Sequence, residues 1–179
     1  MRNFLIPVWT ALALGLWFAA AQAQSIGRVP SVAEIAARDL TVFPDGTGLP
    51  VGRGTARSGR ALYEAHCAAC HGLRGEGMPY FAALAGGRGS LSSSQPLLTV
   101  GSYWPYASTL WDYTRRAMPY ANPGALSSDE VYSVVAYILH LNDIVGLDEV
   151  LDRHSLPHVK MPNRDGFVPD TRPDVPVRP

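Results

Sequence analysis

The residues best suited to chemistry lie in one short string, Cys67-Ala68-Ala69-Cys70-His71. Its spacing, C-x-x-C-H, is the one that attaches a c-type haem. In such a site the two thiols form thioethers with the haem vinyl groups, and the adjacent histidine becomes the proximal ligand of the iron. The chain has two cysteines in all. The string therefore predicts one covalent haem c, held by Cys67, Cys70 and His71.

Three other uses of the two cysteines agree less well with the sequence. A thioredoxin-type pair follows a buried strand, whereas residues 58–66 have a helical pattern. A disulfide across a two-residue loop is strained and stabilises little. A zinc site needs four ligands, and His154 and His158, which have a suitable spacing, stand in or beside a proline-rich tail.

Three helices are predicted around this string. One covers about 58–67 and a second about 107–117. The third covers about 128–141, because Ser127 and Glu130 form a capping box at its start and five apolar residues then follow at helical spacing: Val131, Val134, Val135, Ile138 and Leu139. A further short helix over 31–38 would be capped by Ser31. Strand signals are weak, so the expected fold class is all-α.

Composition excludes several classes of protein. The chain has 179 residues, with 15 Lys and Arg against 15 Asp and Glu. This balance argues against nucleic acid as a partner, since phosphate binding rests on clustered basic residues. With 47% hydrophobic and 17% charged residues, the chain is too apolar to be disordered.

The ends of the chain differ from its centre. Residues 1–23 combine Arg2, an apolar run and a small-residue Ala-Gln-Ala site, which predicts a secretory signal peptide; an uncleaved membrane anchor is the alternative. We expect an N-terminal extension over 24–57, a globular domain over 58–145 and an extended tail over 146–179. The tail has six prolines from Leu156 onward and is expected to form neither helix nor sheet.

The sequence around the haem string resembles class I cytochrome c. In that family a glycine eight positions before the first haem cysteine meets the C-terminal helix, and an aromatic follows four positions later; Gly59 and Tyr63 fill these places. A proline often supplies the carbonyl that accepts the N–H of the proximal histidine. Here Ala82 stands at that place, and any backbone carbonyl can accept this bond.

The resemblance also bears on the sixth ligand of the iron. Met78, Met118 and Met161 are each followed by proline. Met118 precedes the C-terminal helix, where class I cytochromes place their axial methionine, and Met161 is the alternative. An open sixth position would instead indicate a haem enzyme or sensor, with His66 or His140 as polar groups near the haem.

An aromatic stretch, residues 101–120, is expected to wall the haem pocket. Its members are Trp104, Tyr106, Trp111 and Tyr113. Tryptophan N–H and tyrosine O–H groups can bond a haem propionate. Arg115 or Arg116 would pair with a propionate or lie in solvent.

Four strings narrow the resemblance: PDGTGLPVGRGT (44–55), GSYWPYASTLWDYTRRAMPY (101–120), PGALSSDEVYSVVAYILHLN (123–142) and MPNRDGF (161–167). They resemble the cytochrome c subunits of periplasmic sulfite and sulfane dehydrogenases, including the cytochrome of the sulfur-oxidising (Sox) system. The Sox-system subunit is longer and has a second haem domain, so this chain, with one C-x-x-C-H string, is closer in size to the monohaem subunit of a sulfite dehydrogenase. The resemblance implies a periplasmic electron-transfer subunit. It implies a molybdenum-cofactor subunit of the sulfite oxidase type as electron donor and a soluble cytochrome c as acceptor. A free-standing soluble carrier is the alternative. The extension and tail would lie along the partner or cover the chain's own haem edge.

Overall fold

The computed structural model describes residues 27–170 and 172. The chain separates into two compact units, one up to Asp39 and one from Leu40 onward. The predicted signal peptide, residues 1–23, lies outside the described residues. The globular unit begins at Leu40. Val42 and Leu49, placed in the expected extension, are buried core residues.

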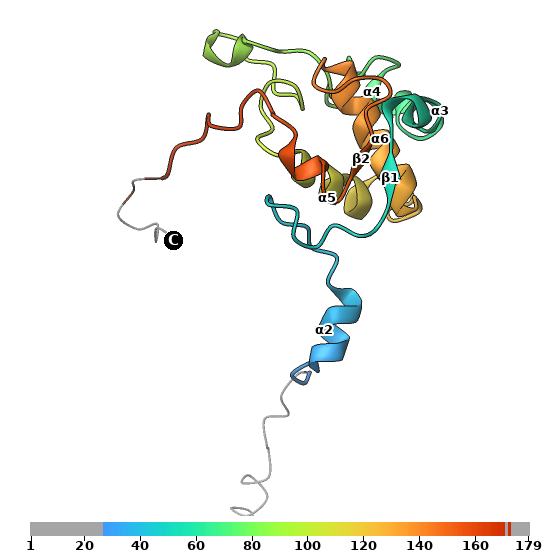
Figure 1. Ribbon diagram of the computed structural model, residues 1–179. Helices are drawn as coiled ribbons and strands as arrows, with labels where there is room; N and C mark the ends of the chain where they lie inside the picture. Colours follow the sequence, from blue (N-terminus) through green and yellow to red (C-terminus); the bar gives the residue numbers. More distant parts are fainter. Residues whose placement is uncertain (1–26, 171, 173–179) are drawn as a thin grey trace, which may run out of the picture. The chain divides into compact units, whose positions relative to one another are not determined.

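Helix α6 (Ser128–Leu141) forms the centre of the globular unit (Figure 1). Ser127 caps it and Glu130 completes the capping box, as the sequence predicts. The sequence predicts one apolar face, but every residue from Val131 to Leu139 is buried. The reason is that α3 (Ala56–His66), α5 (Ala107–Ala117) and a small sheet all pack against α6.

Helix α3 approaches α6 so closely that only glycine fits at the contact. A Cβ atom on Gly59 would lie 1.8 Å from the backbone oxygen of Ser133 and 3.0 Å from Cβ of Tyr137. Next to the contact, the rings of Tyr63 and Tyr137 lie 5.2 Å apart between centroids. The predicted crossing of the two helices at Gly59 is therefore confirmed. Helix α3 begins two residues earlier than expected because Thr55 and Ser58 cap it reciprocally.

Strand β1 (Arg53–Gly54) pairs with strand β2 (Leu151–Asp152) in an antiparallel sheet of two residues a side. Strand β2 and the 3₁₀ helix η2 (Leu156–His158) belong to the segment expected to be an extended tail. Leu151, Leu156 and Met161 are buried in the core. The expectation that no helix forms from Leu156 onward is therefore wrong for this turn. Pro157 stands at the start of η2, where a missing N–H costs nothing.

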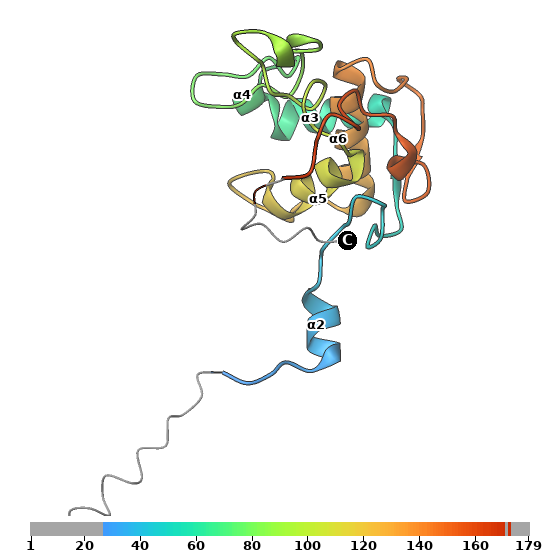
Figure 2. The same ribbon diagram turned by 90° about the vertical axis from the view of Figure 1, so that its left-hand side faces the viewer.

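Helix α2 (Val32–Arg38) lies in the first unit, and Ser31 and Glu34 cap it as the sequence predicts. Figure 2 shows the helices of the globular unit from a second side. The architecture is mostly helical, which confirms the all-α fold class. Within the described part of the chain, no helix is both long and apolar enough to cross a membrane.

The contact at Gly59 gives a stability prediction. Gly59→Ala is expected to lower the free energy of unfolding by about 3 kcal/mol, because the added methyl group must push the α6 backbone away. Denaturant unfolding followed by circular dichroism measures this. Arg60→Ala is the control, since Arg60 lies one position along α3 in solvent and pairs with Glu64 on the same helix. Equal stability of the two variants would contradict the close crossing.

Candidate haem site

The two cysteines and the histidine stand where α3 gives way to the short helix α4 (Ala68–His71). Cys67 ends α3 and precedes α4, and Cys70 lies one turn further on. Both thiols are free and half-buried. The pKa of Cys67 is raised to about 11, mainly because the thiol is buried and to a smaller extent because Cys70 lies nearby. Two unbridged thiols one helical turn apart form the donor set that the C-x-x-C-H spacing predicts.

His71 is oriented by a backbone carbonyl. Its Nδ1 atom lies 2.8 Å from the oxygen of Ala82. Because a carbonyl oxygen can only accept, Nδ1 carries the proton of the neutral ring, and Nε2 keeps its lone pair free for a metal. In the sequence, Ala82 stands where the family often has a proline, and in the structure its carbonyl fills that role.

The loop after α4 is tied down by bonds that begin at the motif itself. The Gly77 N–H donates to the oxygen of His71 at 2.8 Å, and the Tyr63 hydroxyl donates to the oxygen of Gly72 at 2.9 Å. Burial raises the pKa of Tyr63 well above that of free tyrosine, so the hydroxyl remains a donor. Gly72 has a φ of 79°, a left-handed conformation that favours glycine.

Asn142 connects this loop to the end of α6, a role that the sequence did not reveal. Its side chain donates to the oxygens of Leu84 and Ile138, at 3.1 and 2.9 Å, and accepts from the N–H of Gly86 at 3.1 Å. Asn142 is 6% exposed. The one available signal was an asparagine at the end of a helix, which is too common a feature to indicate this role.

The three methionines have different surroundings. Met118 is the residue at which α5 ends, and it is half-buried. Met161 is 3% exposed within the hydrophobic core. Met78 is 49% exposed on the loop after the motif.

A segment near the N-terminal side of the globular unit, residues 40–50, is bound to α5 through polar side chains. Asp112 on α5 accepts from the Val42 N–H at 3.1 Å, and Ser108 donates to the oxygen of Pro44 at 2.7 Å. Asp112 also pairs with Arg116 one turn along the same helix. Helix α5, which leads to Met118, is therefore fixed by hydrogen bonds to the backbone of Val42 and Pro44.

The aromatic stretch contributes to both the core and the surface. Trp111 is fully buried and packs against Tyr132, with ring centroids 5.4 Å apart. Arg115 lies over the Trp111 ring, 5.6 Å from its centroid. Arg116 is exposed, as one of the two expectations had it, and pairs with Asp112 on the same helix. Among the described residues, Trp111 Nε1 is the one buried side-chain nitrogen or oxygen without a hydrogen-bond partner.

Two of the strings that carry the resemblance meet in space. Asn163 donates to the oxygen of Tyr103 at 2.8 Å, the rings of Tyr103 and Phe167 meet edge to face at 5.2 Å, and Arg164 lies 4.4 Å from the ring centre of Tyr106. Residues 161–167 thus lie along residues 103–106 of the same chain. This part of the expected tail therefore packs against its own globular unit.

The residues present fit a c-type haem. The free thiols and the oriented His71 would provide both thioethers and the proximal nitrogen. Leu73 and Phe81, close to His71 along the loop, are 65% and 48% exposed, and large apolar side chains in such positions call for an apolar cover. The unpaired N–H of Trp111 is a donor for which a haem carboxylate would be a suitable acceptor.

Comparisons with known proteins agree with this geometry. The sequence profile of the cytochrome c family matches residues 56–142. A chain in the crystal structure of the sulfane dehydrogenase SoxCD from Paracoccus pantotrophus is 43% identical, with a TM-score of 0.77 over 84% of this chain and 74% of that one.

The chain belongs to the cytochrome c family. This cytochrome carries covalently bound haem c and transfers electrons, and its single C-x-x-C-H string gives it one haem. The family and fold class expected from the sequence are confirmed. No curated protein sequence matches this cytochrome at a significant level.

The bond between Asp112 and Val42 gives a second prediction. Asp112→Ala is expected to cost about 2 kcal/mol of unfolding free energy, because it leaves a buried N–H without an acceptor. Asp112→Asn retains an acceptor oxygen and should lose less than half of that. Denaturant titration of the haem-loaded protein compares them. Equal losses would assign the effect to the ion pair with Arg116 instead.

Proposed function

We propose that this cytochrome takes electrons singly from a molybdenum-cofactor subunit of the sulfite oxidase type and passes them to a soluble cytochrome c or the respiratory chain. Bound haem c supplies the Fe(III)/Fe(II) couple for this transfer. The observation that carries the proposal is the 2.8 Å bond from His71 Nδ1 to the Ala82 carbonyl, beside two free thiols. This bond would orient the imidazole whose other nitrogen binds the iron.

Each residue of the motif has a role in the proposal. Cys67 and Cys70 form the two thioethers, so that the haem cannot diffuse away in an extracytoplasmic compartment. His71 is the proximal ligand through Nε2. The Ala82 carbonyl fixes the tautomer and plane of the ring and raises the basicity of the coordinating nitrogen.

Met118 is the proposed sixth ligand, with Met161 as the alternative. Met118 ends α5 and is half-buried, so its thioether is not committed to the core. Met161 is packed among core side chains, and withdrawing it toward a haem would leave a cavity. A six-coordinate iron with histidine and methionine leaves no position for a substrate, which favours electron transfer over catalysis.

The similarity to a chain of SoxCD supports a sulfur dehydrogenase as the partner. It also supports the periplasm as the location, in agreement with the signal peptide expected over residues 1–23. Once that segment is cleaved after Ala23, no membrane attachment is proposed. The sulfur substrate would be oxidised at the molybdenum subunit and not at the haem.

Two alternatives have weaker support. A free-standing soluble carrier needs no partner, but it leaves the similarity to SoxCD unexplained. A haem enzyme or sensor needs polar groups at an open iron position. His140 stands near the end of α6, and its Nδ1 atom lies 3.0 Å from the backbone oxygen of Val145. His66 is exposed. Neither histidine therefore supports this alternative.

The sixth ligand is tested by two matched variants. Met118→Leu is expected to convert the low-spin spectrum to high spin and to allow carbon monoxide to bind the reduced protein rapidly. Met161→Leu should keep the low-spin spectrum and lower stability by about 1 kcal/mol, as a volume-conserving change in a core. Absorption and electron paramagnetic resonance spectra measure both. The reverse pattern would make Met161 the ligand, and rapid carbon monoxide binding by the native protein would favour the enzyme or sensor.

The partner is tested by purifying the tagged cytochrome from its native host. A molybdenum-containing protein is expected to co-elute in fixed proportion, and sulfite or thiosulfate should reduce the haem in the complex. Metal analysis and the haem absorption bands measure the two effects. The Cys67→Ser/Cys70→Ser variant, which lacks covalent haem, is the control for electron transfer. A lone monomer under the same conditions would favour the free-standing carrier.

A further inference from the structure

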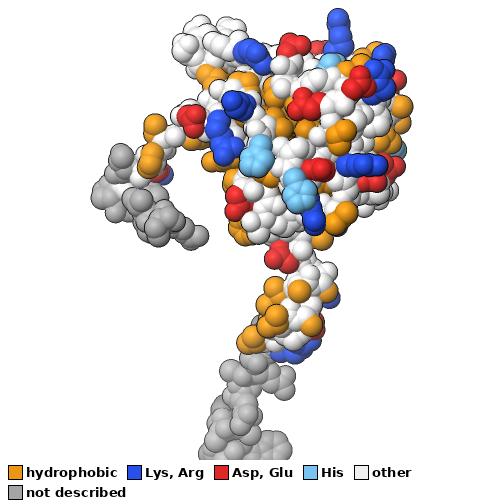
Figure 3. All heavy atoms as spheres, in the orientation of Figure 1, with side chains coloured by type: hydrophobic (Ala, Val, Ile, Leu, Met, Phe, Trp, Pro, Cys, Tyr) orange, Lys and Arg blue, Asp and Glu red, His pale blue; other side chains and the backbone are white. Residues whose placement is uncertain are grey.

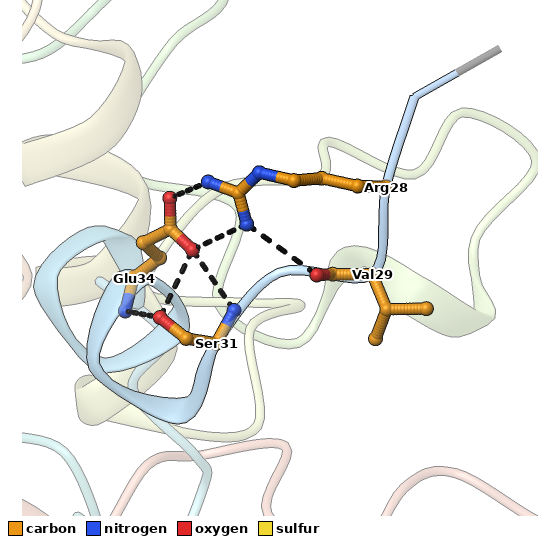
Figure 4. Close-up of polar contacts among 4 residues, drawn as sticks. All are labelled: Arg28, Val29, Ser31 and Glu34. Atoms are coloured by element: carbon orange, nitrogen blue, oxygen red, sulfur yellow. Dashed lines mark hydrogen bonds and ion pairs between the residues drawn. The ribbon is translucent and has the colours of Figure 1, made fainter.

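Two kinds of polar side-chain contact occur in the described part of the chain. The contacts at the cap of α2, which Figure 4 shows, join residues at most six positions apart and order only their own segment. The side chain of Asn142 instead bonds to backbone groups 56 and 58 residues away. Asn142 is buried, so little water competes for these bonds. Contacts of this second kind fix distant segments relative to one another.

Three alternate residues of one loop segment bond to residue 142. The Asn142 side chain donates to the oxygen of Leu84 at 3.1 Å and accepts from the N–H of Gly86 at 3.1 Å. The guanidinium of Arg88 donates to the backbone oxygen of Asn142 at 2.9 Å. Residues 84–88 are therefore attached at three points to the C-terminal end of α6.

The acceptor of the proximal hydrogen bond lies just before this attached segment. Ala82, whose oxygen is 2.8 Å from His71 Nδ1, stands two residues before Leu84. Residues 78–82 are all exposed, so packing does little to hold the Ala82 carbonyl in place. Hydrogen bonds on either side must hold it. Before the exposed residues, the Gly77 N–H donates to the oxygen of His71 at 2.8 Å, and after them the chain is fixed at Leu84.

Asn142 differs from the other partners of Leu84. The Leu84 N–H donates to the oxygen of Gly75 at 2.8 Å, and the Leu84 oxygen also accepts from the N–H of Val100 at 3.2 Å. Gly75 and Val100 lie in loops, whereas Asn142 ends α6. Since α6 also makes the close crossing with α3 at Gly59, the Asn142 amide connects the Ala82 carbonyl to the helix that places the haem motif.

Surface charge offers no comparable control over the iron. Lys and Arg side chains are mixed with Asp and Glu over the visible face of the globular unit, as Figure 3 shows, and the full chain has 15 of each kind. A surface on which the two signs are mixed creates no large field of one sign. The reduction potential of the iron should therefore depend on its burial, its ligands and the hydrogen bonds of those ligands.

We infer that Asn142 is a positioning residue for the proximal histidine, and that it sets the reduction potential through the hydrogen bond between His71 and Ala82. The inference rests on His71 as the proximal ligand in the proposed function, and not on the identity of the electron donor. By holding Leu84, the Asn142 amide keeps the Ala82 carbonyl within bonding distance of Nδ1. This bond makes Nε2 a stronger electron donor, which stabilises Fe(III) relative to Fe(II).

The test replaces Asn142 in the full, haem-loaded protein. In Asn142→Ala the loop loses its amide contacts, so the bond between His71 and Ala82 weakens and Nε2 becomes a poorer donor. The ratio of Fe(II) to Fe(III) at a fixed applied potential is expected to rise about fivefold, the ratio that corresponds to one ordinary hydrogen bond. The His71 Nδ1–H of the reduced protein should exchange with solvent about tenfold faster. Redox titration and nuclear magnetic resonance measure the two effects.

Two further variants separate positioning from stability. Leu151→Ala leaves a cavity in the core and removes no side-chain hydrogen bond. It is expected to lower stability but to keep the iron ratio within about 1.5-fold of the native value. Gly101→Ala retains Asn142, but its Cβ would lie 2.0 Å from Asn142 Oδ1, so the amide must shift. This variant should change both measurements in the same direction as Asn142→Ala and by less, and it tests the inference if Asn142→Ala does not fold.

The outcomes separate this inference from the proposed function. If the His71 ring protons of the native, reduced protein show no ring-current shift from the haem, His71 is not the proximal ligand, and the ligand assignment and the inference both fail. If the shift is present but Asn142→Ala and Gly101→Ala keep the native potential and exchange rate, the assignment stands and Asn142 is a structural residue only. An equal change in Leu151→Ala would also overturn the inference, because the potential would then follow stability.

Discussion

The placement of the haem motif depends on how closely α3 approaches α6. The Gly59 backbone contacts that of Ser133, so the two helices cross at a fixed point with no side chain between them. Cys67 is the residue at which α3 ends, two turns beyond the crossing. Any shift of α3 along α6 would therefore move both cysteines and His71 together. Well-packed interiors resist such shifts because their side chains interlock.

The second constraint comes from the loop that follows the motif. Through the Ala82 carbonyl the loop sets the orientation of the His71 ring, and through Asn142 it is fastened to the far end of α6. The same helix thus fixes the motif at one end and the carbonyl acceptor at the other. A single buried element therefore controls both the position and the orientation of the proximal ligand, an arrangement that favours rapid electron transfer with little rearrangement.

Much of this arrangement could be predicted from local sequence patterns. The C-x-x-C-H string, the capping box at Ser127 and the glycine at residue 59 each depend on residues a few positions apart. The bonds that join Asp112 to Val42, and Asn142 to Leu84 and Gly86, could not be predicted. They connect side chains to backbone groups 56 to 70 residues away and follow no periodic pattern. Proline content gave the wrong prediction for residues 151–161, because a proline such as Pro157 fits the first turn of η2 and does not prevent packing.

The pairing of β1 with β2 also has a consequence for how the protein is made. Residues 53–54 find their partners at 151–152, and Met161 fills the core from still further along the chain. A chain that is synthesised from its N-terminus contains Cys67 and Cys70 long before it contains residues 151–161. The small sheet and the core of the globular unit therefore cannot be completed until nearly all of the chain has been synthesised. During that interval both thiols are accessible, so haem attachment can come before the final closure of the fold.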